Sequence, residues 1–255
     1  MAGGGCAQEK LGSNGSAAQL LRGLGHTSTG AAPALTAMVC DRKPINGLAG
    51  IRVKATASVM LDGKTLHSEA GEILFTEYGL SGVCIMNCSC YWRQGADIVL
   101  DLLRAFGLRS RDELMRELEE RREHRSGMAC ARLLTGLCVQ RVADCVLKAA
   151  GISKDAGIGS LGDRELRRLC DAIAAFRVPV LGLRGFEQAQ VTSGGIRAEE
   201  FDPGTMASKR VPGLYACGEV LDVTGECGGY NLMFAAATGL LAGVALAGTV
   251  KKSVG

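Results

Sequence analysis

The chain has 255 residues, enough to bury the core of one large domain or two small ones. Hydrophobic residues make up 47% of it and charged residues 22%, which excludes a wholly disordered protein. Lys and Arg together number 29 against 26 Asp and Glu, and a net charge of only +3 argues against a protein that binds nucleic acid through charge.

Glycine and cysteine are the two residue types used unusually. The 36 glycines are about twice the usual share of ~7% and follow no collagen-like period, so they must serve turns, close packing or ligand contact. The 11 cysteines are odd in number and scattered, which indicates reduced thiols and a cytoplasmic protein. Cys84, Cys88 and Cys90 lack both a CxxC pair and a second cluster, so we predict no metal site. The N-terminus does not have the pattern of a signal peptide.

The first part of the chain is predicted to be mainly β. A short helix over 17–24 should stop at Gly25. From Ile51 to Leu61 apolar residues occupy every second position, which is the period of a half-buried strand. Asp62-Gly63 is a hairpin turn signal, so this strand should pair with a second one over roughly 71–76.

The middle of the chain is predicted to be helical. Ser110 lies three residues before Glu113, the spacing of a capping box, and marks the start of a helix. Its acidic and basic side chains between 109 and 125 neutralise one another, which is typical of a solvated face. Further helices are predicted over 133–150 and 163–176.

One glycine motif in this region is rejected as a nucleotide site. Gly157 to Gly162 reads formally as GxGxxG, but a dinucleotide fingerprint needs a preceding strand and an acid some ~20 residues later. Here a helix end and a loop precede the motif, and no acid lies at that distance. The glycines therefore indicate a loop that leads into the next helix.

After the helices, strands are predicted over 186–192 and 211–217, and the second strand runs into a glycine-rich loop. Gly218 lets backbone approach a ligand, and Glu219 can accept hydrogen bonds from sugar hydroxyls. Asn231 is the expected cap of the following helix, whose N-terminus favours negative charge. This arrangement suits a flavin, because the flavin ring gains negative charge on reduction.

The apolar helix itself has two interpretations. Leu232 to Val250 contains no charged residue, so its length would allow a membrane span. We favour instead a buried helix, because its many Ala and Gly residues suit close packing against a sheet or a cofactor. A membrane anchor is the alternative.

The segment from Gly213 to Gly243 resembles the C-terminal FAD-contacting motif of a bacterial and archaeal flavoprotein family that includes aminoacetone oxidase and 3-dehydro-bile-acid reductase. The resemblance covers nearly the whole chain in order. It continues in these segments: Gly3-Gly4, Leu11 to Ser13, Leu48 to Val53, Leu74 to Gly82, Phe186 to Ile196 and Thr205 to Lys209.

The resemblance implies an α/β fold with inserts. A partial Rossmann-like FAD-binding domain would carry an inserted β-barrel-like domain, which carries a helical domain of its own. The expected boundaries are 1–32 for the first piece of the FAD-binding domain, 33–108 for the first part of the β domain, 109–176 for the helical insert, 177–196 for the return strands and 197–255 for the last piece of the FAD-binding domain.

The implied activity is an FAD-dependent oxidoreductase that transfers hydride between a small organic substrate and flavin, with NAD(P)H as a candidate electron donor. No catalytic residue is assigned; Tyr230 and Thr192 are candidates to face the flavin ring. The residues expected to bind the cofactor are Gly3, Gly4, Gly218, Glu219, Gly228, Gly229, Tyr230, Asn231 and Leu232.

One departure from the family pattern matters. Members begin with a strand, a GxGxxG loop and an acid that holds the adenosine ribose, and this chain shows none of the three. We therefore expect a truncated form that needs a complementing N-terminal fragment to bind FAD. The alternative is a non-catalytic remnant, or one chain of a split flavoprotein, that binds no cofactor alone.

Overall fold

The computed structural model describes the backbone of residues 1–254 and the side-chain surroundings of residues 1–248. Contacts divide the chain into two compact units. We call Ala37–Gly182 the inserted unit, and Met1–Thr36 together with Leu183–Gly255 the terminal unit. Each is described by itself, and the domain boundaries given above remain predictions.

A seven-stranded sheet forms the centre of the inserted unit, in the order β7-β6-β3-β4-β5-β2-β8. The edge strands β7 and β8 are separated in sequence by Pro179 alone, so the sheet must curl until its edges approach, as expected of a barrel-like domain. Its strands are β2 (Met38–Cys40), β3 (Arg52–Leu61), β4 (Lys64–Phe75), β5 (Gly79–Ser81), β6 (Asp97–Asp101), β7 (Phe176–Val178) and β8 (Val180–Leu183).

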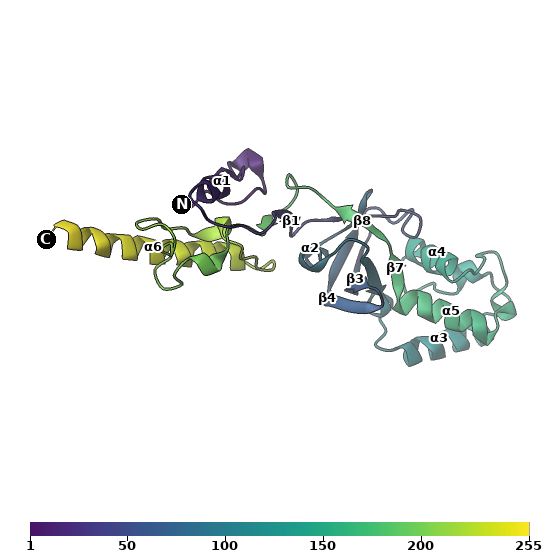
Figure 1. Cartoon of the computed structure of the whole chain (residues 1–255). Coiled ribbons are helices and arrows are strands. Elements are labelled where there is room, and N and C mark those ends of the chain that lie inside the picture. Colours follow the sequence, from purple (N-terminus) through teal and green to yellow (C-terminus); the bar gives the residue numbers. More distant parts are fainter. Residues whose placement is uncertain (255) are drawn as a thin grey trace. The chain divides into compact units, whose positions relative to one another are not determined.

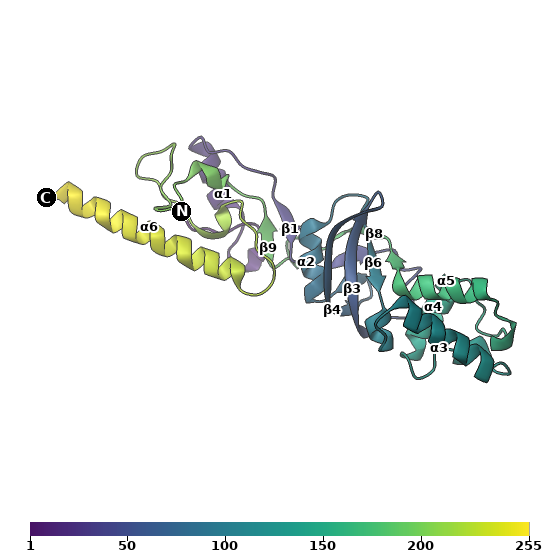
Figure 2. The ribbon, with the colours of Figure 1, turned by 90° about the horizontal axis from the view of Figure 1, so that it is seen from below.

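The predicted hairpin is confirmed as the β3–β4 pair. Asp62 and Gly63 both have positive φ, 49° and 75°, as a tight two-residue hairpin turn requires. Val53, Ala55, Ala57 and Val59 are buried while their neighbours are more exposed, so the period of two places one face in the core. Helix α2 (Val83–Tyr91) lies along β3 and β4 in both views (Figures 1 and 2).

Three helices, α3 (Arg111–His124), α4 (Gln140–Ala149) and α5 (Asp163–Ala174), lie together in both views (Figures 1 and 2). The predicted cap is confirmed, because Ser110 Oγ accepts the Glu113 backbone N–H at 3.1 Å. The segment also contains three short 3-10 helices: η2 (Leu103–Phe106), η3 (Cys130–Arg132) and η4 (Ile158–Ser160).

Two helix boundaries differ from the prediction. The helix expected over 133–150 begins only at Gln140, because residues 133–139 form turns that bury Leu133 and Leu134 without helical pairing. The helix expected over 163–176 ends at Ala174, because Phe176 pairs with Leu100 in the sheet. Tertiary pairing outweighs local helix propensity at this end.

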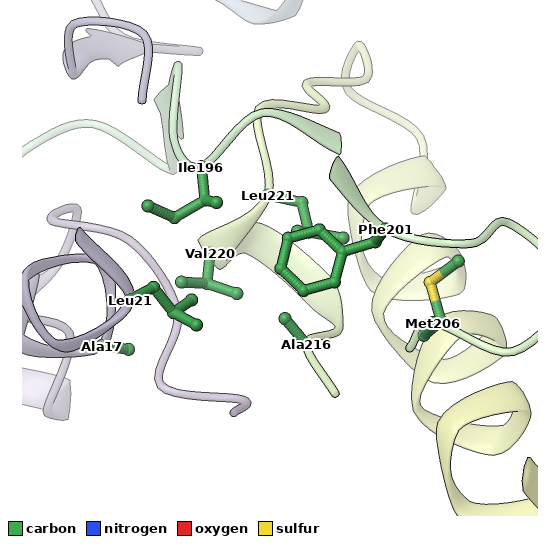
Figure 3. Packing of buried hydrophobic residues seen from close by; sticks show 8 residues of the cluster. All are labelled: Ala17, Leu21, Ile196, Phe201, Met206, Ala216, Val220 and Leu221. Carbon is green, nitrogen blue, oxygen red and sulfur yellow. The ribbon is translucent and has the colours of Figure 1, made fainter. Parts of the chain in front are cut away.

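The terminal unit has a smaller framework. It contains η1 (Glu9–Leu11), α1 (Ser16–Gly23), β1 (Ala32–Ala34), β9 (Val191–Ser193), η5 (Ala198–Glu200), η6 (Gly218–Val220) and α6 (Tyr230–Val254). Figure 3 shows how α1, the 196–206 segment and the 216–221 segment direct side chains toward a shared core. That core contains Ala17, Leu21, Ile196, Phe201, Met206, Ala216, Val220 and Leu221.

Strand predictions in this unit were too long. The strand expected over 186–192 is reduced to β9, which pairs antiparallel with β1. The strand expected over 211–217 is absent, and only an isolated bridge between Ala207 and Tyr215 stands there. Both segments lack the neighbouring strands that would satisfy a longer ladder within the described residues. A Rossmann-like arrangement of the terminal unit therefore remains a proposal.

Helix α6 corrects a further prediction. The apolar helix is present, but only 6% of its Tyr230–Gly248 stretch is buried. The prediction that the chain buries this helix was therefore wrong. Phe234 and Ala242 of the helix pack against the core of the terminal unit. Leu232 and Leu240 are 79% and 70% exposed. By length and a mean hydropathy of 1.6, the helix is long and apolar enough to cross a membrane.

Candidate functional site

A cavity of about 330 Å³ opens in the terminal unit beside the first turn of α6. Its lining includes the glycine-rich loop that precedes the helix and several apolar side chains. The lining residues are Leu35, Gln190, Val191, Glu219, Glu226, Cys227, Gly228, Gly229, Asn231, Leu232 and Ala235.

The loop is closed by a pair of side-chain hydrogen bonds from Asn231. Its Oδ1 accepts the Gly225 N–H at 2.8 Å, and its Nδ2 donates to the Gly225 carbonyl oxygen at 2.8 Å. The expected role of Asn231 as helix cap is wrong, because α6 already begins at Tyr230 and the amide bonds to Gly225 instead. Gly228 and Gly229 have φ of 134° and 88°, a backbone that favours glycine.

Tyr230 packs onto this loop. A Cβ at Gly225 would lie 2.9 Å from Tyr230 Cβ, and one at Gly228 would lie 3.1 Å from Tyr230 Cε2. The tyrosine side chain therefore occupies the space that larger residues would need at 225 and 228. Tyr230 does not line the cavity.

Glu219 lines the cavity and is held by β9, which is in turn bonded to the N-terminal segment. Its Oε1 accepts the Thr192 backbone N–H at 2.5 Å. The Thr192 hydroxyl in turn accepts the N–H groups of Cys6 and Ala7 at 2.7 and 3.0 Å. Thr192 is 3% exposed and does not line the cavity. It is a buried residue whose hydrogen bonds connect separate segments of the chain.

The glycines at the N-terminus allow close contacts in this region, and Gly5 lies against Thr192 and Glu219. A Cβ at Gly5 would lie 2.4 Å from Thr192 Oγ1 and 3.2 Å from Glu219 Cδ. At Gly4 it would lie 2.7 Å from Ser13 Oγ, and at Gly3 2.6 Å from Ala17 Cβ. Gly3 and Gly4 therefore contact the chain itself and do not line the cavity.

Gly218 joins the site to helix α6. Its N–H donates to Thr238 Oγ1 at 3.0 Å, and its φ of 72° suits glycine. A Cβ there would lie 3.3 Å from Ala235 Cβ, so the small residues at 218 and 235 let the loop lie close to the helix. Gly218 itself does not line the cavity.

The structure brings five of the predicted residues together around the cavity: Glu219, Gly228, Gly229, Asn231 and Leu232. It adds Leu35, Gln190 and Val191, which lie far from the loop in sequence. No local pattern marks Leu35 as a lining residue. The 186–196 segment that contains Gln190 and Val191 carries part of the family resemblance, but its pattern does not predict a cavity.

A second polar cluster in the terminal unit is structural. His26 has a fully buried side chain, with Nδ1 2.7 Å from Glu200 Oε2 and Nε2 3.0 Å from Ser208 Oγ. Burial raises the pKa of Glu200, but hydrogen bonds from Thr27, His26 and Arg210 outweigh it and hold that pKa at about 2. This cluster joins the end of α1 to η5 and does not line the cavity.

The cysteines differ in accessibility. Burial, with Glu69 nearby, raises the pKa of both Cys84 and Cys88 to about 12, so these thiols stay protonated and unreactive. Cys227 lies in the cavity wall, 3.9 Å from Gln190 Oε1. Within the part of the chain that the structure describes, no three His, Cys, Asp or Glu side chains are placed to hold a metal ion.

Residues 32–191, more than half of the chain, match the family model of the HI0933-like protein barrel and H2TH domain. The chain therefore belongs to the HI0933-like family, a family of FAD flavoproteins. The match agrees with the curled antiparallel sheet of the inserted unit and with the helices that lie between its strands β6 and β7 in sequence.

Three curated relatives give the family context. The 3-dehydro-bile acid delta(4,6)-reductase of Clostridium scindens is 32% identical over 253 residues, 96% of this chain and 60% of its own length. The ribosomal RNA dihydrouridine synthases of Escherichia coli and Haemophilus influenzae are 32% and 29% identical, over 74% and 76% of this chain and 44% and 45% of their own lengths. The chain thus spans less than two thirds of each of these relatives.

Proposed function

We propose that this chain is part of an FAD-dependent oxidoreductase that transfers hydride between a small organic substrate and flavin, and that its cavity contributes to the flavin site. The observation that carries the proposal is the cavity between Glu219, the loop Gly225–Asn231 and the first turn of α6. Membership of a flavoprotein family supports the choice of cofactor.

The residues around the cavity fit a flavin chemically. Leu35, Val191 and Leu232 supply apolar surface for a flat ring. The first N–H groups of α6 have no acceptor within their own helix and favour a ring edge that gains negative charge. Glu219 uses Oε1 on Thr192, which leaves Oε2 to accept a hydrogen bond from a cofactor hydroxyl. A bound flavin would supply the hydride chemistry itself.

The substrate is not determined by family membership. The names of the relatives assign one to a bile-acid derivative and two to ribosomal RNA, so the family acts on very different molecules. We therefore propose only the class of substrate, a small organic molecule, and NAD(P)H as the electron donor to test. The net charge of +3 gives no support for a nucleic-acid substrate.

We further propose that flavin binding requires a second segment, equivalent to the part of the reductase that does not align with this chain. That segment, supplied on the same or on another polypeptide, would cover the exposed apolar face of α6. Leu232, Leu240 and Val244 are 79%, 70% and 66% exposed, a surface that a soluble helix normally buries.

The test compares residues 1–255 alone with the same chain expressed together with the corresponding reductase segment. After incubation with FAD and gel filtration, we expect the chain alone to be colourless and the pair to be yellow. Bleaching of the flavin absorbance by NADH or NADPH would identify the donor. A yellow complex from the chain alone would overturn the need for the segment, and a colourless pair would overturn flavin binding.

Two substitutions, each with a matched control, sharpen this test. Glu219→Gln keeps the acceptor for Thr192 N–H but loses the carboxylate charge, so it should weaken flavin binding roughly tenfold, about 1.4 kcal/mol. Glu199→Gln, on a side chain that is 73% exposed, is its control. Leu240→Glu should prevent association with the segment, whereas Leu181→Glu, at a site 67% exposed in the inserted unit, should not.

The competing function is a non-catalytic remnant, or a helix-anchored protein. A Leu240→Glu chain that still binds the segment would remove the docking role of α6. Partition of the unmodified chain into lipid vesicles, lost in the Leu240→Glu variant, would favour the membrane anchor instead.

A further inference from the structure

The Asn231 side chain imitates a peptide group. Its Oδ1 and Nδ2 each form a 2.8 Å hydrogen bond to the N–H and the carbonyl oxygen of one residue, Gly225. This pairing fixes the orientation of the amide, because the Gly225 N–H needs an acceptor and its carbonyl needs a donor.

The two bonds close the chain between Gly225 and Asn231 into a short ring. The enclosed residues Glu226, Cys227, Gly228 and Gly229 all line the cavity. Gly228 and Gly229 are glycines at positive φ, with more backbone freedom than other residue types, so without a tie this wall would sample many shapes. The Met233 N–H donates to Gly229 O at 2.9 Å, which attaches the other end of the ring to α6.

We propose that Asn231 is a positioning residue: it holds the loop Gly225–Asn231 in the one shape that forms the cavity wall, and it does so by the paired bonds to Gly225. The inference rests on the proposed function only where it concerns flavin. Helix capping is the competing role, and the two make opposite predictions for the same substitutions.

Asn231→Asp and Asn231→Ser separate these roles. Asp and Ser are as good as Asn at helix N-termini, so a cap would tolerate both. The paired bonds from Asn231 to Gly225, which we call the clamp, would tolerate neither substitution. A carboxylate has no donor for the Gly225 carbonyl, and a serine is too short to reach both atoms. At pH 7 we expect the Gly225 amide hydrogen of both variants of the full chain to exchange roughly tenfold faster than in the unsubstituted chain.

Acidification provides a signature that a general structural role would not give. A protonated Asp carries an O–H that can donate to the Gly225 carbonyl while its other oxygen still accepts the Gly225 N–H. Protonation is thus favoured in the folded form, which raises the pKa of the introduced carboxyl above the ordinary Asp value of about 3.9. The defect of Asn231→Asp is therefore fully present above that raised pKa and disappears as pH falls through it toward about 3.9. Asn231→Ser should show no such recovery.

The measurement is amide hydrogen exchange of Gly225 at pH 7 and near pH 4, each variant expressed as a ratio to the unsubstituted chain at the same pH. Asn46→Asp, on an exposed asparagine of the inserted unit, controls for the added charge. Unchanged exchange in both variants, or equal defects of Asp and Ser at both pH values, would overturn the clamp.

A flavin titration is run separately on the chain with its complementing segment. If the unsubstituted pair binds FAD, Asn231→Ser should raise the dissociation constant roughly tenfold. Equal affinity would overturn the link between the clamp and the cofactor. If the unsubstituted pair binds no FAD, the proposed function fails, while the exchange ratios still decide whether Asn231 holds the loop.

Discussion

The inserted unit places large apolar side chains such as Phe75, Ile85 and Ile98 inside a curled sheet and its covering helices, whereas the terminal unit leaves Leu232, Leu240 and Val244 of α6 exposed. The first unit is stabilised by apolar burial over long strand ladders. The second depends on close glycine contacts, buried hydrogen bonds and a small core. From this difference we expect the inserted unit to fold by itself, and we expect the terminal unit to be stabilised by a surface that covers α6.

The largest effect is expected from a substitution in the core of the inserted unit. Phe75→Ala removes a ring that is 1% exposed, so the free energy of unfolding should fall by about 3–5 kcal/mol. Chemical denaturation followed by circular dichroism measures the loss. Leu181→Ala, at a side chain 67% exposed, is the control and should change little. Equal effects at the two positions would contradict the burial described here.

Glu200→Gln tests the polar cluster of the terminal unit. Loss of the charged hydrogen bonds from His26 and Arg210 should cost about 1.5–3 kcal/mol at pH 7. Because the folded pKa of Glu200 is lowered from 4.5 to about 2, its stabilisation is present above pH 4.5 and is lost as pH falls toward 2. Unfolding curves across that range should therefore converge for the two proteins. A constant gap down to pH 2 would contradict the assignment.

Gly5→Ala tests the glycine contacts that hold Glu219. The new methyl group would lie 2.4 Å from Thr192 Oγ1, so the terminal unit should lose about 1–3 kcal/mol. Gly23→Ala is the matched control, because its Cβ meets nothing within 4 Å and it lies at the end of helix α1. That control should be neutral, or more stable by up to about 1 kcal/mol. Thermal unfolding of both variants checks the contrast.

The smallest expected effect concerns one helix of the inserted unit. Ser110→Ala removes the acceptor for the Glu113 N–H and should cost about 1 kcal/mol. Limited proteolysis should still leave a resistant core near residues 37–182, because the sheet does not depend on this cap. Loss of the whole core in the variant would show that the unit is less independent than its packing indicates.

The sequence alone determined the local features whose causes lie within a few residues. Alternation over Ile51–Leu61, the turn at Asp62-Gly63 and the Ser110 cap were predicted and confirmed, because strand period, turn conformation and capping are local properties. The family was also accessible, since its motifs are spread in order along the chain.

Tertiary structure decided what depends on contacts between distant residues. It showed Thr192 bonded to Cys6 and Ala7, and Leu35 in the wall of the cavity. It also showed that Asn231 bonds to Gly225, six residues away, and does not cap the helix. It also left α6 exposed, although its composition suits burial. A hydropathy pattern states that a surface is apolar, but only the packing of the other elements determines whether anything covers it.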